Sequence, residues 1–406
     1  MTVSTSRQRR SPRSGRSGDG PARDAWRRLA ACTAAAALLQ LDGTLITVAL
    51  PSVARGLDVT SAATSTVLAA YFTAYAVTLL PAGALVDRLG ARHVALVGLA
   101  VFAIGAAAGA LAPTLVLLTA TRVIQGVGAG LVSPAALAGA VSGFPAERRG
   151  TALGVWGASA GMANLLGPAL GGALTVLLGW RADWWVLVPL ALLAGLGIIR
   201  NLPGARHRRS PDAGPQVLNR VVIAATMVAA LTFAVMIGSF YLAEQYLQDR
   251  AGYSALGASA VLVVVAVLVG VAAPISGRLV DRSGERQSAL IGFLAAGIGL
   301  ALLCLPDLPL DSPVALGPLV PIGLGIGMLF VPASRAALNA TPPAAHGRTS
   351  SVLSIGRLLG ATAGVGLAGL AISAGATAQT VHRALLIAAA LCIVVGVPTA
   401  ARLRPL

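Results

Sequence analysis

The chain has 406 residues, of which 56% are hydrophobic and only 11% are charged. This composition excludes a soluble domain, because the surface of such a domain needs a larger share of charged residues. A net charge of +16 would favour nucleic-acid binding in a soluble protein, but in a chain this apolar it reports orientation in a membrane. We therefore expect an all-α integral membrane protein with no nucleic-acid partner.

Twelve apolar runs of about 20 residues can be laid out, each long enough to cross a hydrocarbon core of about 30 Å as a helix. They form two six-helix halves, 29–202 and 220–406, after an Arg-rich tail at 1–28. Residues 203–219 are polar and Pro-rich, and are predicted to be a cytoplasmic linker. In chain order the predicted spans are 29–50, 62–84, 94–112, 115–140, 150–178, 182–202, 220–247, 254–277, 287–306, 313–336, 349–374 and 381–401.

The arginines indicate how these spans are oriented. With the N-terminus in the cytoplasm, 24 of the 30 Arg residues fall on cytoplasmic segments, four fall on external segments, and Arg122 and Arg357 lie within the membrane. This distribution follows the positive-inside rule, so both termini are predicted to be cytoplasmic. The tail 1–28 is interpreted as a disordered anchor that contacts anionic lipid, with a small binding domain as the alternative.

Asp42 lies near the middle of the first predicted span, where an acid costs about 2.5–3.5 kcal/mol to insert. The functional interpretation is a carboxylate that gains and loses a proton, and the structural one is a hydrogen-bonded packing residue beside Gly43. Arg122 in the fourth span is a second charge, and a buried guanidinium needs a carboxylate, carbonyls or water around it. The sequence leaves open whether Asp42 is that partner or whether Arg122 is a purely structural residue bonded to carbonyls.

The turn after the second span is repeated half a chain later, since Gly83–His93 recurs as Gly277–Gln287. Each copy joins two apolar runs, which is typical of a transporter that is built from structural repeats and has its site at their interface. Further repeats at a nearly constant offset pair Gly126–Gly130 with Gly323–Gly327, Pro145 with Pro343, and Thr151 with Thr349.

Asp87 and Asp281 occupy equivalent places in the two copies, at the cytoplasmic end of a span. A carboxylate there can cap backbone donors of the next helix or meet another positive helix end. We interpret this turn as a conformational switch that closes the inner face, with turn formation and topology alone as the alternative. The predicted switch residues are Gly83, Asp87, Arg88, Gly90, Arg92, Asp281 and Arg282.

The fifth span is rich in glycine and contains one proline. Small residues let neighbouring helices approach closely and proline favours a bend, so we expect a bent helix that moves against its neighbours. A generic packing stripe is the alternative. The residues concerned are Gly154, Gly157, Gly161, Gly167, Pro168, Gly171 and Gly172.

Aromatic and polar residues on several spans could line a cavity for an amphipathic ligand, although each aromatic alone could equally be a packing residue. Arg357 could instead extend to the inner face, and Glu244 could bind a cationic substrate, exchange a second proton or lie at a rim. Trp180, Trp184 and Trp185 are expected in the outer aromatic belt. The predicted cavity residues are Tyr71, Phe72, Tyr75, Gln125, Trp156, Asn164, Phe240, Tyr241, Gln245 and Arg357.

The sequence has no Gly-rich loop ending in Gly-Lys-Ser/Thr and no Lys at all, so no nucleotide site is predicted. Its three Cys and four His residues show no metal-ligand spacing. We expect neither an enzyme nor a cofactor or metal, and expect a proton gradient as the energy source.

Several of these segments resemble motifs of the major facilitator superfamily, in particular its drug:proton antiporters. Gly83–Arg92 resembles the loop motif after the second helix, with Ala91 where a basic residue is usual. The fifth-span glycines resemble the antiporter signature, with Ala163 in place of a glycine. Leu41–Pro51 resembles the first-helix motif of fourteen-helix exporters, but the linker is too short for two extra helices. The fourth-helix motif is matched by Leu118, Arg122, Gln125, Gly126 and Gly128.

The resemblance covers the whole chain and implies a role in proton coupling for Arg122. Asp42 and Glu244 are the other two residues predicted to take part in proton coupling. The resemblance predicts a monomeric antiporter in a bacterial plasma membrane that exchanges protons for a hydrophobic or amphipathic small molecule, as in drug or antibiotic efflux. An uptake symporter on the same fold is the transport alternative. A non-transporting membrane sensor or assembly partner is the alternative from another class.

Overall fold

The computed structural model describes residues 19–59, 63–204, 217–249, 255–304, 316–373 and 378–403, and all regular elements within them are helical. The first half comprises α1 (Asp19–Gly56), α2 (Ser65–Leu89), α3 (Ala91–Ala110), α4 (Leu115–Val141), η1 (Ala146–Arg148), α5 (Arg149–Leu178), α6 (Arg181–Trp185) and α7 (Leu187–Asn201). The second comprises α8 (Arg220–Asp249), α9 (Ala255–Ser283), α10 (Glu285–Leu302), α11 (Leu316–Asn339), η3 (Pro343–Ala345), α12 (His346–Ser373), α13 (Ala378–Ala390), η4 (Leu391–Gly396) and α14 (Val397–Ala401).

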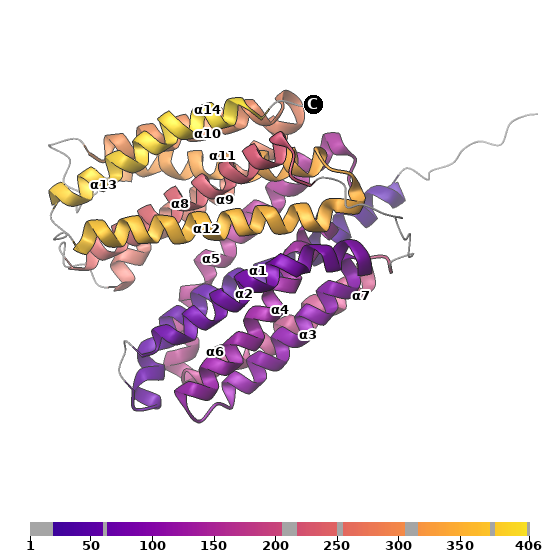
Figure 1. The fold of residues 1–406 in the computed structure, drawn as a ribbon. Coiled ribbons are helices and arrows are strands. Elements are labelled where there is room, and N and C mark those ends of the chain that lie inside the picture. The colour runs from indigo at the N-terminus through magenta and orange to yellow at the C-terminus, as the bar shows by residue number, and fades with distance from the viewer. Residues whose placement is uncertain are drawn as a thin grey trace, which may run out of the picture.

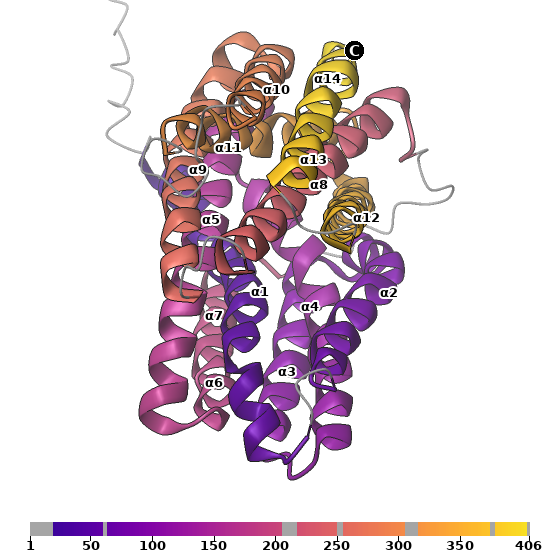
Figure 2. The same ribbon diagram turned by 90° about the vertical axis from the view of Figure 1, so that its left-hand side faces the viewer.

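The two halves form two groups of helices (Figure 1). Each group has its own hydrophobic core, one built from α1 to α7 and the other from α8 to α14. The groups meet at the end of the bundle where α1 begins and α14 ends, and they diverge toward the opposite end. Figure 2 shows the contacts between halves, in which α5 packs on α9 and α2 packs on α12.

Ten helical segments in the described residues are long and apolar enough to cross a membrane. The helices α5 and α10 are further long helices in the same bundle, and most predicted spans begin and end within a few residues of the observed helices. The main exception is α1, which begins at Asp19, so the prediction of a disordered tail was wrong for residues 19–28. The all-α membrane fold in two halves is therefore confirmed, whereas the count of twelve spans and the cytoplasmic placement of the termini stay predictions.

Close helix packing within each half depends on the repeated glycines. A Cβ atom on Gly128 of α4 would lie 2.6 Å from the Gly98 carbonyl oxygen and 2.6 Å from the Phe102 amide nitrogen of α3. The equivalent glycine of the second half, Gly325 on α11, would place its Cβ 2.5 Å from the Ala296 amide nitrogen of α10. The repeat thus preserves a position where two backbones touch.

Two tryptophans expected in the outer aromatic belt are buried instead, so that prediction was wrong for them. Trp184 has no exposed surface and Trp180 only 6%, and their rings pack edge to face at 5.6 Å. Trp185 is 45% exposed, as a belt residue would be. Sequence position alone did not distinguish a tryptophan that faces lipid from one that faces a neighbouring helix.

A leucine at the α3–α4 crossing should destabilise the protein. We expect Gly128→Leu to cost about 1–3 kcal/mol, because the side chain must displace backbone atoms of α3. Gly366→Leu is the matched control, since a Cβ atom there meets nothing within 4 Å. Melting temperatures in detergent measure the difference, and equal values for the two variants would contradict the packing argument.

Candidate functional site

The two charges predicted within the membrane are partners. Nη1 of Arg122 on α4 lies 2.8 Å from Oδ1 and 3.0 Å from Oδ2 of Asp42 on α1, and both side chains have no exposed surface. An ion pair shielded from water in this way is strongly coupled, because removal of either charge leaves the other uncompensated. The structure therefore answers the question that the sequence left open.

The surroundings of Arg122 provide several further contacts. The Tyr71 ring lies under the guanidinium, 4.1 Å from its carbon to the ring centroid, and Nη1 also donates to Gln125 Oε1 at 3.2 Å. Nε donates to the Val67 carbonyl at 3.4 Å. Arg122 Nη2 and Gln125 Nε2 are buried without a hydrogen-bond partner among the described residues. Buried donors without partners are unusual, and they leave the guanidinium able to adopt a second set of bonds.

A second group of charges closes the end of the bundle where the halves meet. Asp87, at the end of α2, accepts from the amides of Gly347 (2.7 Å) and Arg348 (3.2 Å) at the start of α12, and from Arg348 Nε at 2.8 Å. The carboxylate thus caps a helix of the other half and not the adjacent α3. A negative charge at a helix N-terminus is favourable because it meets unpaired amides and the positive end of the helix dipole.

The second copy of the turn makes the reciprocal contact. Asp281, at the end of α9, accepts from the amides of Gly150 (2.8 Å) and Thr151 (2.7 Å) at the start of α5, and also from the Thr151 hydroxyl. Gly83 and Gly277 allow these crossings, since a Cβ on Gly83 would lie 2.7 Å from the Gly347 oxygen and one on Gly277 would overlap Gly150. Each half therefore caps a helix of the other.

Further bonds at this end were not predicted from the sequence. Arg335 Nη1 binds Glu285 at 2.7 Å while its Nε approaches Asp281 at 3.5 Å and donates to the Ala146 carbonyl at 3.3 Å. Arg149 Nη1 donates to Asn339 Oδ1 at 2.8 Å across the two halves. Asp281 and Glu285 belong to the repeated turn, whereas Arg335, Arg149 and Asn339 fall outside it. The repeated Thr151 and Thr349 mark the first turns of the capped helices and could have indicated the place.

Other predicted switch residues lie away from the inter-half contact. Arg88 and Arg282 are exposed, and the described part of the chain offers them no bond to the opposite half. Arg92 donates to the Leu202 carbonyl at 3.2 Å within its own half. Gly90 forms the turn itself, with φ at 85°, a backbone conformation that favours glycine.

A polar cluster lies between the halves, nearer the middle of the helices. Ser133 on α4 and Ser354 on α12 lie 3.4 Å apart. Arg357, one turn further along α12, donates to Ser334 on α11 at 2.6 Å and lies 5.8 Å from the Phe233 ring centroid. Tyr75 on α2 is close enough to Ser133 and Arg357 to interact with both. Arg357 thus points between the helices and does not extend to the inner face.

The remaining predicted cavity residues are distributed unevenly. Tyr71 and Gln125 pack on Arg122, Phe72 is 41% exposed, and Trp156 and Phe240 are partly buried. Several other predictions lie outside the described side chains, so their roles stay predictions. These are Asn164, Tyr241, Glu244, Gln245, Gly161 and Pro168.

The helix α5 connects the two halves through its glycines. Gly154 and Gly157 lie against Ala273 of α9, and Gly157 also against Phe330 of α11. Further along, Gly167 and Gly171 lie against α1 at Thr44 and Leu45, while Gly172 is partly buried. The glycines near the start of α5 thus contact the second half of the chain, and those near its end contact α1. Small residues allow close packing at both places.

Comparisons with known proteins agree with this arrangement. The family profile described as Major Facilitator Superfamily matches residues 32–365. The chain is 31% identical to the puromycin resistance protein pur8 of Streptomyces alboniger, over 88% of this chain and 84% of that protein. It is 27% identical to the multidrug resistance protein Stp of Mycobacterium tuberculosis, over 83% and 74% respectively. The solved structure of the proton:xylose symporter XylE has the same fold, with a TM-score of 0.75, 16% identity, and coverage of 92% of this chain and 94% of that one.

If the two caps hold this end of the bundle together, substitutions that remove them should make the end open more often. Loss of a capping carboxylate costs about 0.5–2 kcal/mol, so Asp87→Ala should open this end several-fold more often. Arg348→Gln should have a smaller effect because both backbone bonds to Asp87 remain. The measurement is the labelling rate of Ser354→Cys by a membrane-impermeant maleimide in inside-out vesicles, with the three native cysteines replaced.

Arg88→Gln is the control, since Arg88 is exposed at the same helix end. If it raises labelling as much as Asp87→Ala does, the caps do not govern closure.

Proposed function

Because the chain belongs to the Major Facilitator Superfamily, we propose that it is a proton-coupled antiporter that exports hydrophobic or amphipathic small molecules from a bacterial cell. The observation that carries this proposal is the fully buried pair of Asp42 and Arg122. The resistance proteins among its relatives support export. A multi-pass membrane protein of this family is a transporter, and such carriers are generally not enzymes.

Proton coupling would follow from the chemistry of the buried pair. Protonation neutralises Asp42 and leaves the Arg122 guanidinium without its counter-charge, a state that costs about 3–5 kcal/mol in a buried site. Rearrangement can offset this cost, because Arg122 already donates to Gln125 and to the Val67 carbonyl, and its Nη2 can donate to a new acceptor. Movement of α1 relative to α4 would therefore accompany binding or release of one proton.

The helix α2 would transmit this movement to the inner end. Val67 and Tyr71 contact Arg122, and Asp87 lies 16 residues beyond Tyr71, about 24 Å along the helix axis. A tilt of α2 would place strain on the Asp87 cap and, through the closed end, on the reciprocal Asp281 cap. Alternating access then consists of breaking both caps while the diverging end closes.

The substrate would lie between the halves, against the polar cluster of Tyr75, Ser133, Ser354 and Arg357. Phe72, Trp156 and Phe240 would supply apolar surface nearby, in keeping with a hydrophobic or amphipathic molecule.

An uptake symporter remains the second candidate because the proton:xylose symporter has the same fold. The test is accumulation of a panel of labelled amphipathic compounds in an efflux-deficient bacterial host, with and without this chain. Lower accumulation supports export, and higher accumulation supports uptake. An unchanged panel contradicts both and favours a non-transporting membrane sensor or assembly partner.

Coupling should depend on Asp42. Asp42→Asn keeps an acceptor for Arg122 but cannot exchange a proton, so in proteoliposomes substrate-induced proton movement and gradient-driven accumulation should vanish. Downhill exchange should persist, since it needs only the conformational cycle. Asp24→Asn is the control, because Asp24 is largely exposed at the start of the same helix. Coupled transport at a near-normal rate in folded Asp42→Asn would move the proton site elsewhere, with Glu244 next.

Glu244 is proposed to bind positive charge near the outer end of α8. On this hypothesis Glu244→Gln should weaken export of cationic compounds several-fold more than export of neutral compounds of similar size. The measurement is the resistance conferred on the efflux-deficient host by each variant. Equal losses for both compound classes would refute charge recognition at this position.

A further inference from the structure

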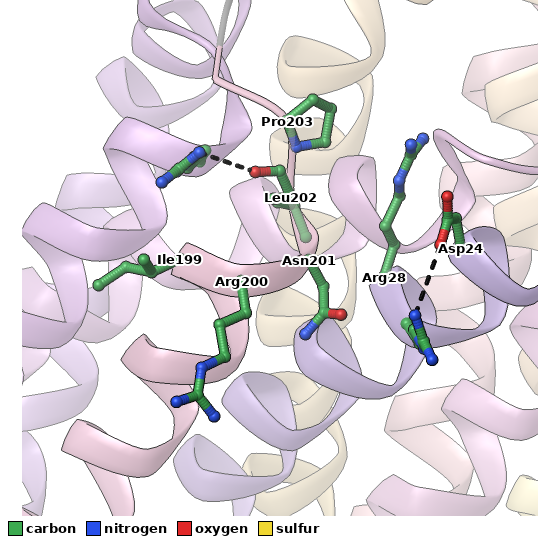
Figure 3. Close-up of a pocket in the computed structure, with 9 residues that line it drawn as sticks. Asp24, Arg28, Ile199, Arg200, Asn201, Leu202 and Pro203 are labelled. Atoms are coloured by element: carbon green, nitrogen blue, oxygen red, sulfur yellow. Dashed lines mark hydrogen bonds and ion pairs between the residues drawn. The ribbon is translucent and has the colours of Figure 1, made fainter.

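A basic pocket lies apart from the site described above, on the first half alone and at the end where the halves meet. It is a cavity of about 300 Å³ formed by the start of α1, the start of α3 and the end of α7. Figure 3 shows Asp24 and Arg28 of α1 facing the segment Ile199–Pro203 at the end of α7. Its lining residues are Asp24, Arg27, Arg28, Arg92, Ile199, Arg200, Asn201, Leu202 and Pro203.

The charges in this pocket are not balanced. Four arginines face a single acid, Asp24, whose contact with Arg27 is long at 3.8 Å and largely exposed. Arg28 Nε is buried without a hydrogen-bond partner in the described part of the chain, and Arg200 is exposed. The neighbouring sequence adds more positive than negative charge, since residues 1–18 contain five Arg and no acid, and residues 205–216 contain three Arg and one acid.

The surface beside the pocket is apolar and continuous with it. On α7 Leu192 (65%), Leu196 (40%) and Ile199 (48%) are exposed, and on α3 Val97 (56%) and Ile104 (63%) are exposed. These two helices pack side by side, and a Cβ on Gly195 would lie 3.9 Å from Leu96. The exposed side chains therefore form one lipid-facing surface that ends at the arginines.

An exposed tryptophan marks the level of the membrane interface here. Trp26, 45% exposed, lies on α1 between Asp24 and Arg27 and packs edge to face on Phe144. Tryptophan prefers the headgroup region of a bilayer, so we expect the pocket to lie at the depth of the phosphate groups.

We propose that this pocket binds one anionic phospholipid of the inner leaflet, with its phosphate between Arg28, Arg92 and Arg200 and its acyl chains on the α3–α7 surface. Guanidinium groups bind phosphate oxygens in a bidentate manner, and basic pockets between membrane helices on this side attract anionic headgroups. The apolar surface distinguishes this ligand from free phosphate, which would use the arginines alone. The lipid would link α1, α3 and α7 of the first half.

The test uses native mass spectrometry of the purified full chain in detergent, titrated with phosphatidylglycerol or with phosphatidylcholine of the same acyl chains. We expect one tightly bound phosphatidylglycerol and at least tenfold weaker binding of phosphatidylcholine. The double variant Arg28→Gln/Arg200→Gln should lose at least tenfold in phosphatidylglycerol binding. The matched control, Arg286→Gln/Arg402→Gln, removes the same charge from exposed positions of the second half and should bind normally.

Equal binding of the two lipids would overturn the proposal, as would equal losses in the two double variants. Displacement of the lipid by millimolar inorganic phosphate would assign the pocket to free phosphate instead. Melting temperatures measured without added lipid confirm that the variants are folded. None of these measurements depends on transport, so they test lipid binding independently of the proposed function.

Discussion

A guanidinium shielded from water needs a counter-charge, and in the first half Asp42 meets that need for Arg122. The pair joins α1 to α4, while Tyr71 and the Val67 carbonyl join α2 to the same group. Three helices are thus joined through the Asp42–Arg122 pair. In the described second half, Arg357 is bonded to Ser334 of the same half, and the buried pair of Arg335 and Glu285 lies at the end where the halves meet. The duplicated fold therefore carries unequal charges at its centre.

The end where the halves meet is more symmetric, because both copies of the repeated turn make the same kind of contact there. Each repeated turn ends in a carboxylate that caps the first turn of a helix in the other half, so one motif yields two reciprocal contacts. Such caps combine backbone bonds with the helix dipole and need no long flexible side chain. The arginine contacts are unequal again, with Arg348 on one cap and Arg335 with Glu285 beside the other. The two contacts between the halves thus share the same backbone caps but differ in the charged side chains beside them.

Hydropathy predicted where each helix lies along the membrane normal, which is why the spans and the depth of Asp42 and Arg122 could be read from the sequence. Hydropathy gives no information on the rotation of a helix about its axis. The pairing of residues 80 positions apart, the burial of Trp184 and the choice of α12 over α3 as the partner of Asp87 all depend on that rotation. The sequence repeat indicated where the two halves meet, but the residues that pair there depend on how the helices pack.

The turn between α2 and α3 contains Asp87 and Arg92, which the sequence analysis placed in one switch but which make separate contacts. Gly90, with φ at 85°, reverses the chain so that Asp87 at the end of α2 faces the other half while Arg92 at the start of α3 faces the basic pocket. A side chain at Gly90 would strain the turn and act on both contacts at once. Substitution of Asp87 should act on the contact between the halves and substitution of Arg92 on the basic pocket, although the two residues lie only five positions apart.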